Sequence, residues 1–156
     1  MCLIIIEDTR NKPEKNKNIR DQLEKLGHKV VRSKLYCGDY SWATDQKVCI
    51  DTKQDLQEVC GNVTQQHERF RAECERAKEA GIQLIILVQE PSVKILSDVC
   101  TWYNWRKKKN PKAVSGKQLY KILATMTERY GVSWQFCTKA NVGQRIVELL
   151  EGDVVV

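Results

Sequence analysis

Apolar residues along this chain fall into two kinds of block, and each kind predicts a different element. Residues 3–6 and 82–88 are almost continuously apolar, which is typical of strands buried on both faces of a sheet. Elsewhere apolar residues recur every three or four positions, as at Ile19, Leu23 and Leu26, and this spacing predicts amphipathic helices. Buried strands that alternate with such helices predict an α/β fold.

The remaining elements follow from the same patterns and from the positions of glycine. Helices are predicted over residues 14–26, 55–80, 115–130 and 141–151, the second with a break near residues 60–62. Further strands are predicted over residues 28–36, 48–53 and 132–137. A turn at Cys37-Gly38-Asp39 is expected to bring strand 48–53 back beside strand 28–36. Residues 1–156 are therefore expected to form a single domain.

Composition narrows the class of protein. A chain of 156 residues can bury a core without disulfide staples. The net charge of +6 and the pI of about 8.9 favour a polyanionic partner. No apolar stretch has the length of a membrane span, and the first apolar run is too short for a signal peptide. We therefore expect a cytoplasmic protein with no membrane partner.

The seven cysteines are scattered and include no C-x-x-C pair, so we expect reduced thiols that pack as small apolar side chains. Cys60, His67 and Cys74 resemble a zinc set because they are spaced seven residues apart in a predicted helix. Seven helical residues rise about 10 Å. Zinc ligands lie about 2 Å from the ion, so these three residues cannot share one zinc.

The strongest chemical signal is an acidic pair with a lysine. Asp39 follows Gly38 at a predicted turn, and Asp51 precedes Lys53 by two residues on the predicted strand 48–53. Side chains at i and i+2 of a strand point to the same face, so Asp51 and Lys53 are expected to project together. Two carboxylates and an ammonium are the minimum equipment for metal-assisted phosphodiester hydrolysis. The alternative is an ordinary solvated strand face beside a common turn.

A third acid stands at the end of the first predicted strand. Asp8 lies at the carboxyl end of that strand, where ligand crevices form in open α/β sheets. It is expected to join Asp39 and Asp51, and the neighbouring Glu7 is an alternative acid that points to the other side of the strand. A turn or a helix cap is the simpler explanation for Asp8.

These residues occur in the order of a known family pattern. The apolar strand ending in Asp8-Thr9-Arg10, then Gly38-Asp39-Tyr40, then Asp51-Thr52-Lys53, then the apolar run 84–88 resemble the motifs of the XPF-type structure-specific endonuclease domain. The resemblance covers about residues 2–150. It implies a mixed central sheet flanked by helices, as in restriction-endonuclease-like nucleases. It also implies Mg²⁺ or Mn²⁺ held by Asp8, Asp39 and Asp51, with Lys53 as the positioning or charge-offsetting group and Arg10 touching phosphate.

The sequence departs from the family pattern at two places. The family has Glu-Arg-Lys where this chain has Asp51-Thr52-Lys53, and it has Glu where this chain has Asn11. Aspartate for glutamate keeps a carboxylate on a shorter side chain, but threonine for arginine removes a phosphate contact. Family members usually add a helix-hairpin-helix domain, and we expect none within these 156 residues. Such a compact version suits a phage or mobile-element nuclease.

Two further regions are candidates for binding DNA. Gln66 and Arg69 lie one helical turn apart where the family carries a glutamine and an arginine. A basic run follows Trp102, Tyr103 and Trp105, and such a mobile loop can grip phosphates and stack on a base. A solvated surface is the alternative for both regions. The run's five cations are Arg106, Lys107, Lys108, Lys109 and Lys112.

The sequence therefore predicts a metal-dependent DNA endonuclease, with branched DNA such as flaps or junctions as the substrate that the resemblance implies. Two alternatives stay open: a catalytically silent DNA-binding or scaffold subunit, and a restriction-like or junction-resolving nuclease of the same superfamily. A homodimer is expected through the apolar helix 119–126 and the last helix, which carries Val142, Ile146, Leu149 and Leu150.

Overall fold

A mixed six-stranded sheet forms the centre of the molecule. The computed structural model describes residues 3–154. The spatial order of the strands is β2-β1-β3-β4-β5-β6, with β1 antiparallel to β3 and β3 antiparallel to β4, while the other neighbours run parallel. The α/β fold with a mixed central sheet that the sequence predicted is confirmed. The strands are β1 (Ile4–Glu7), β2 (Lys29–Arg32), β3 (Tyr40–Trp42), β4 (Val48–Lys53), β5 (Gln83–Gln89) and β6 (Ser133–Cys137).

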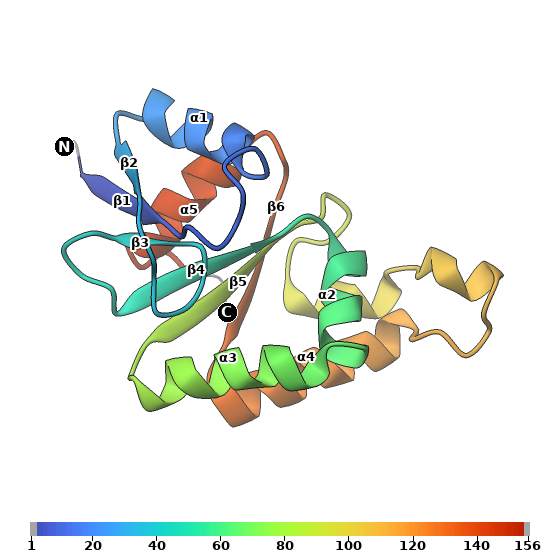
Figure 1. Cartoon of the computed structure of the whole chain (residues 1–156). Coiled ribbons are helices and arrows are strands. Elements are labelled where there is room, and N and C mark those ends of the chain that lie inside the picture. The colour runs from blue at the N-terminus through green and yellow to red at the C-terminus, as the bar shows by residue number, and fades with distance from the viewer. Residues whose placement is uncertain (1–2, 155–156) are drawn as a thin grey trace.

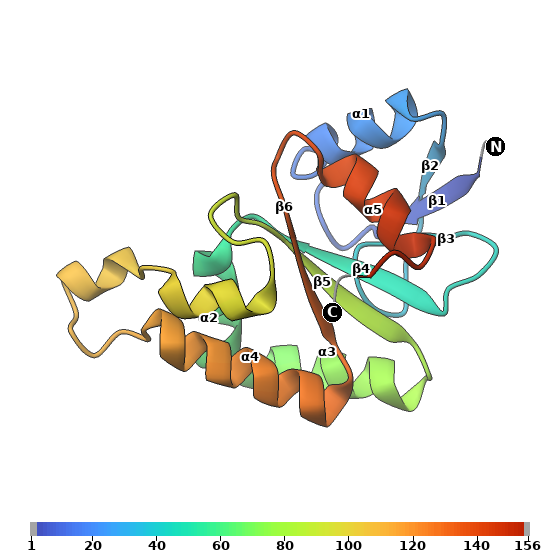
Figure 2. The same cartoon turned by 180° about the vertical axis from the view of Figure 1, so that it is seen from behind.

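Helices cover both faces of the sheet (Figures 1 and 2). One face is covered by α1 (Lys17–Lys25) and α5 (Val142–Leu150), which pack together. The other face is covered by α2 (Leu56–Thr64), α3 (His67–Glu79) and α4 (Gly116–Tyr130). Two short 3₁₀ helices, η1 (Leu96–Thr101) and η2 (Trp105–Lys108), precede α4. None of the helices within residues 3–154 combines the length and the apolar composition that crossing a bilayer requires.

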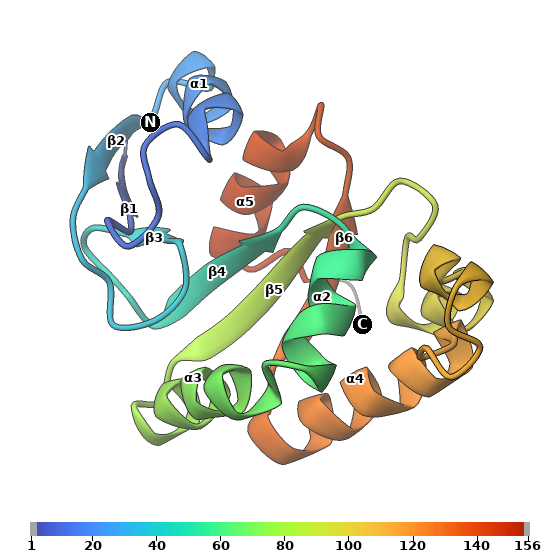
Figure 3. The same cartoon turned by 45° about the vertical axis from the view of Figure 1, so that its right-hand side comes forward.

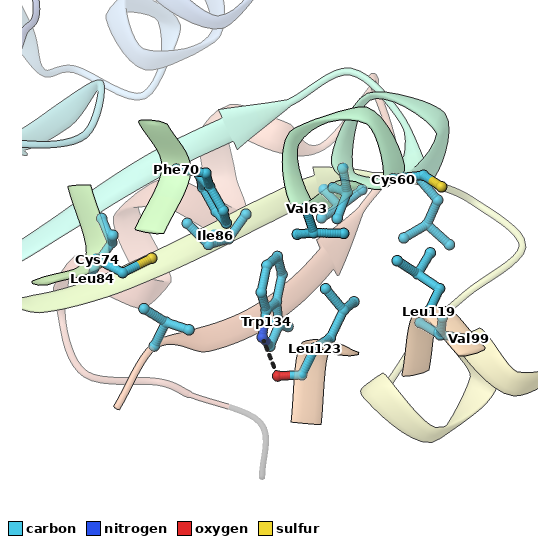
Figure 4. Packing of buried hydrophobic residues seen from close by; sticks show 14 of the residues in the cluster. Cys60, Val63, Phe70, Cys74, Leu84, Ile86, Val99, Leu119, Leu123 and Trp134 are labelled. Carbon is cyan, nitrogen blue, oxygen red and sulfur yellow. Dashed lines mark hydrogen bonds between the residues drawn. The ribbon is translucent and has the colours of Figure 1, made fainter. Parts of the chain in front are cut away.

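Burial on both faces explains why the sequence of the interior strand β5 is continuously apolar. Leu84 and Ile86 point to the core under α2, α3 and α4, while Ile85 and Leu87 point to the core under α1 and α5. In the first of these cores, Trp134 lies beside Phe70, with ring centroids 6.1 Å apart (Figure 4). Its indole N–H donates to the carbonyl of Leu123 at 3.1 Å, so the buried polar atom is satisfied.

The strand pairing beside β4 differs from the prediction. The predicted strand 28–36 is only residues 29–32, and it pairs in parallel with β1 at the edge of the sheet rather than with β4. The neighbours of β4 are β5 and β3. The sequence prediction missed β3, which pairs with β4 through Tyr40 and Ile50. Three residues are too few for alternation to mark a strand, and the pattern of one strand does not identify its neighbour.

Two helix boundaries and the conformation of the basic run also differ from the prediction. The helix 14–26 begins only at Lys17, and the charged helix 55–80 breaks at residues 65–66 rather than 60–62. Gly61 lies inside α2, and its carbonyl accepts from the backbone N–H groups of Gln65 and Gln66, both at 3.1 Å, which closes that helix. The first part of the predicted basic loop forms the 3₁₀ helix η2.

Candidate active site

A polar cavity of about 240 Å³ opens where the loop after β1 meets the turn before β3, strand β4 and the helices α2 and α3. Helix α2 follows β4 closely in the chain, and α3 lies along the same face of the sheet (Figure 3). The cavity gathers charged and amide side chains from segments that are distant in sequence. Its lining includes Asp8, Arg10, Asn11, Asp39, Asp51, Lys53, Gln66, Arg69, Phe70 and Glu73.

The β3–β4 pairing places the two central carboxylates. The N–H of Asp39 donates to the carbonyl of Ile50 at 2.7 Å, which extends the ladder one residue beyond Tyr40. Gly38 allows this approach because it has a φ of 73°, and a Cβ there would lie 3.1 Å from that same carbonyl oxygen. Asp39 therefore enters the cavity from the turn before β3 and Asp51 from the adjacent strand β4, each with only 7% of its surface exposed.

Asp39 is held in place by neutral donors. The Asn11 amide donates to its Oδ1 at 2.7 Å, while the N–H and the hydroxyl of Thr52 donate to its Oδ2 at 3.0 and 2.8 Å. Burial and the negative charge of Asp51 nevertheless raise the pKa of Asp39 to about 7. These hydrogen bonds orient the carboxylate, while burial and the charge of Asp51 disfavour its ionised form.

Asp51 and Lys53 project together from β4, as their i, i+2 spacing predicted. The Nζ of Lys53 lies 3.3 Å from Oδ2 of Asp51 and 5.3 Å from the centre of the Phe70 ring. Burial raises the pKa of Asp51. Burial acts to lower the pKa of Lys53, but the charges of Asp51 and other nearby acids outweigh it and raise that pKa. Lys53 is therefore an ammonium at neutral pH.

The donor set fits a hard divalent cation. Asp51 Oδ2 is buried and accepts no hydrogen bond within the described part of the chain, although Lys53 forms an ion pair with it. Mg²⁺ and Mn²⁺ prefer carboxylate oxygen, and one or two carboxylates with substrate phosphate are enough for Mg²⁺. Within residues 3–154 no group of three or more His, Cys, Asp or Glu side chains is arranged to hold a metal. The fit therefore rests on Asp39 and Asp51.

Asp8 lines the cavity, but its oxygens are already engaged. Its Oδ2 accepts from the backbone N–H and the Nε of Arg10 at 3.0 and 2.7 Å, and its Oδ1 accepts from the N–H of Leu35 at 2.8 Å. Burial acts to raise the pKa of Asp8, but these donors outweigh it and lower that pKa. Its role as a metal ligand stays a prediction, and so does the phosphate contact of Arg10.

Glu7 lies outside the cavity lining and belongs to a separate buried network. Its carboxylate accepts from Arg20 at 2.9 Å and from the Tyr40 hydroxyl at 2.7 Å, and it also pairs with Arg32. These contacts join β1 to α1, β2 and β3 beneath the site. Glu7 is therefore a structural acid, because every partner it has belongs to the scaffold.

Helix α3 and its N-cap residue present one face to the cavity. Gln66, Arg69, Phe70 and Glu73 follow the i, i+3, i+4, i+7 spacing of a single helix face, and all four line the cavity. Sequence reasoning named Gln66 and Arg69 but missed Glu73, although the same spacing includes it. Glu73 accepts from the N–H of Gly38 at 3.2 Å, so it ties α3 to the turn that carries Asp39.

The basic run lies away from this cavity. None of Arg106, Lys107, Lys108, Lys109 and Lys112 contributes to the lining. Lys107 is used internally, because its Nζ donates to the carbonyls of Pro111 and Ala113 at 3.0 and 2.9 Å. DNA binding by the other four cations, which are exposed, remains a prediction.

Comparisons with known proteins support the family that the order of the motifs indicated. A family model described as the ERCC4 domain matches residues 8–150. Two solved structures of XPF from Aeropyrum pernix share 19% sequence identity with the chain. The first has a TM-score of 0.64 and covers 95% of this chain and 60% of its own length. The second, a complex with DNA, has a TM-score of 0.68 and covers 96% and 64%. Comparison with curated proteins gave no match.

Proposed function

The chain belongs to the ERCC4 domain family, and on that premise we propose that it is a metal-dependent endonuclease that hydrolyses phosphodiester bonds in branched DNA. The observation that carries the proposal is the placement of Asp39, Asp51 and Lys53 in one polar cavity. The DNA in the second solved structure belongs to that protein. It supports DNA as the substrate class here because the two folds agree.

The metal is proposed to be Mg²⁺ or Mn²⁺, with Asp39 and Asp51 as its protein ligands. When bound, such an ion makes water a better nucleophile and offsets the charge that develops on the phosphate. Thr52 and Asn11 would keep the Asp39 carboxylate in one orientation through their hydrogen bonds. The two carboxylates would then lose the repulsion that raises the pKa of Asp39.

Lys53 is proposed to act as a fixed positive charge rather than as a base. A base must accept a proton, whereas the raised pKa of Lys53 keeps its ammonium protonated at neutral pH. From its position beside Asp51, the ammonium can donate hydrogen bonds to the attacking water or to a phosphate oxygen. Arg10 and Arg69 line the same cavity and are proposed to hold the phosphates on either side.

A preference for branched DNA would follow from the family, and it would place the protein in DNA repair or recombination. This chain spans 60 and 64% of the length of the two solved structures.

Cleavage of a matched set of DNAs tests the proposal. Linear duplex, flap, splayed-arm and four-way DNAs of one sequence would be incubated with the protein in Mg²⁺, in Mn²⁺ and in EDTA. We expect cuts in the branched DNAs near the branch, only with metal present. Binding of all DNAs without any cut would instead support the catalytically silent subunit. Equal cutting of every DNA would support a restriction-like nuclease.

A further inference from the structure

Two large aromatic side chains are exposed in the segment between η1 and α4. Tyr103 has 58% of its surface exposed and Trp105 has 55%. Aromatic side chains contribute most to folding stability when they are buried, as Trp134 is in the core. Figures 1 and 2 show this segment, in yellow and orange, projecting from the edge of the molecule far from α1 and α5. Core packing therefore does not account for these two rings.

The projecting segment is held in a defined shape. Asn104, between the two aromatic residues, is only 2% exposed, and its Nδ2 donates to the carbonyl of Val114 at 2.8 Å. The internal hydrogen bonds of Lys107 close the turn that follows. A Cβ at Gly116 would lie 2.4 Å from the carbonyl oxygen of Trp102, so α4 begins in direct contact with the base of the segment. These contacts fix the backbone that carries the exposed rings, and a fixed backbone lowers the entropy cost of binding.

The segment that carries the rings has basic side chains and no acidic ones. The chain has no Asp or Glu between Asp98 and Glu128. The guanidinium carbon of Arg106 lies 5.8 Å from the centre of the Trp105 ring, within the range of a cation–π contact. Lys108, Lys109 and Lys112 are exposed on the same segment. Exposed aromatic rings among exposed cations are the features that bind single-stranded nucleic acid, because every base has a face that stacks.

Helix α2 connects this segment to the cavity. The Nδ2 of Asn104 contacts the thiol of Cys60 on α2 at 3.9 Å, while Asn62 on the same helix lines the cavity. Residues two positions apart point to nearly opposite sides of a helix, so the segment and the cavity lie on either side of α2.

We propose that Tyr103 and Trp105 form a platform for unpaired bases of a DNA strand, with Arg106, Lys108 and Lys109 on its phosphates. The inference deepens the proposed nuclease function, on which it rests for its choice of DNA. It supplies a feature of this chain that distinguishes DNA with a single-stranded arm from continuous duplex.

Binding without cleavage tests the platform. The probes are a labelled oligothymidylate of about twenty nucleotides, longer than the 4–16 nucleotides of typical single-strand sites, and a blunt duplex, both in EDTA. Trp105→Ala is expected to weaken binding of the single strand at least about fivefold, the lower end for loss of one stacked base, and to leave the duplex unchanged. Tyr103→Ala is expected to do the same. Leu26→Ala, which truncates another exposed apolar side chain (48% exposed) near α1, is the control and should change neither.

Fluorescence separates stacking from a change of shape. Trp105→Phe keeps a ring and should bind the single strand nearly as well as wild type. The quenching of tryptophan emission by the oligothymidylate should however be lost in this variant. Persistent quenching, or equal weakening of both probes by Trp105→Ala, would overturn the platform. A shift from dimer to monomer in Trp105→Ala by light scattering would instead identify a second copy of the chain as the occupant.

The proposal of a base-stacking platform and the proposal of a nuclease can be contradicted independently of each other. If wild type cuts DNA with metal but Trp105→Ala binds the single strand normally, the platform is wrong and the nuclease stands. If no DNA is cut under any metal but the single-strand binding and its dependence on Trp105 hold, the nuclease is wrong and the platform stands.

Discussion

The side-chain amide of Asn11 donates a hydrogen bond to Oδ1 of Asp39 at 2.7 Å. The XPF-type pattern has a glutamate at the position of Asn11, so a neutral donor here replaces an acid beside the proposed metal. This exchange lowers the number of negative charges in the cavity. It also fixes Asp39 from the side opposite Thr52, which donates to the other oxygen.

Replacing Asn11 by glutamate should restore an acid to the site. We expect Asn11→Glu to bind Mn²⁺ roughly tenfold more tightly, the scale on which outer-shell changes act. It should also melt at a lower temperature in EDTA, because a third acid would repel Asp39. Calorimetric Mn²⁺ titration and thermal unfolding measure the two effects, and Asn11→Gln, which stays neutral, is the control. Unchanged Mn²⁺ affinity in Asn11→Glu would mean that the metal lies elsewhere.

The raised pKa of Asp39 predicts how stability depends on pH without metal. The pKa is about 7 in the folded protein, against an ordinary value of 3.8. Between these values the folded state holds a proton that the unfolded chain releases, so the free energy of unfolding falls as pH rises. The slope from this one group is roughly 1.4 kcal/mol per pH unit. Urea unfolding in EDTA from pH 5 to 8 should show it, and Asp39→Asn should reduce it. Equal slopes in both proteins would reject the assignment.

We expect Lys107 to stabilise the fold and the exposed cations of the basic run to bind DNA. Lys107→Ala removes two internal hydrogen bonds and should lower the melting temperature. The pair Lys108→Ala and Lys109→Ala should leave stability unchanged and reduce the slope of log affinity against log salt by about 0.9 per lost duplex contact. Binding curves at several salt concentrations measure this slope. An unchanged slope would mean that both lysines are only solvated.

The predicted homodimer depends on α4 rather than on α5. Val142, Ile146 and Leu149 of α5 are fully buried within the chain, so they offer no apolar surface to a partner. Ile122 and Met126 of α4 instead line an apolar groove against α3. If a second copy covers this groove, Met126→Glu should convert a dimer to a monomer in light scattering at micromolar concentration. A monomeric wild-type protein would contradict the homodimer.

Residues with a clear periodic or chemical signature were predictable from the sequence. Strand β5 was found because both its faces are buried, which makes the run from Leu84 to Val88 continuously apolar. Asp51 and Lys53 were placed together because strand geometry fixes i and i+2 on one face. The order of the motifs identified the family, and the family model confirmed it.

Other features depend on tertiary contacts that the sequence does not reveal. Strand β3 is only three residues long, and its backbone pairs with β1 on one side and with β4 on the other. The engagement of Asp8 by Arg10 is local, but its contact with the Leu35 N–H spans 27 residues of chain. Glu73 shares the helical spacing of Gln66 and Arg69, so attention to the whole helix face would have found it.

Asp39 and Asp51 are proposed to hold the metal on which DNA cleavage by this protein depends. The most direct measurement is the single-turnover rate of flap DNA cleavage by wild type and by Asp51→Asn as Mg²⁺ is varied. We expect wild type to cut with Mg²⁺ and not in EDTA. We expect Asp51→Asn, which keeps the shape of the side chain but not its charge, to lose roughly 100-fold or more at every Mg²⁺ concentration. Cleavage by Asp51→Asn at close to the wild-type rate, or cleavage by wild type in EDTA, would contradict the claim.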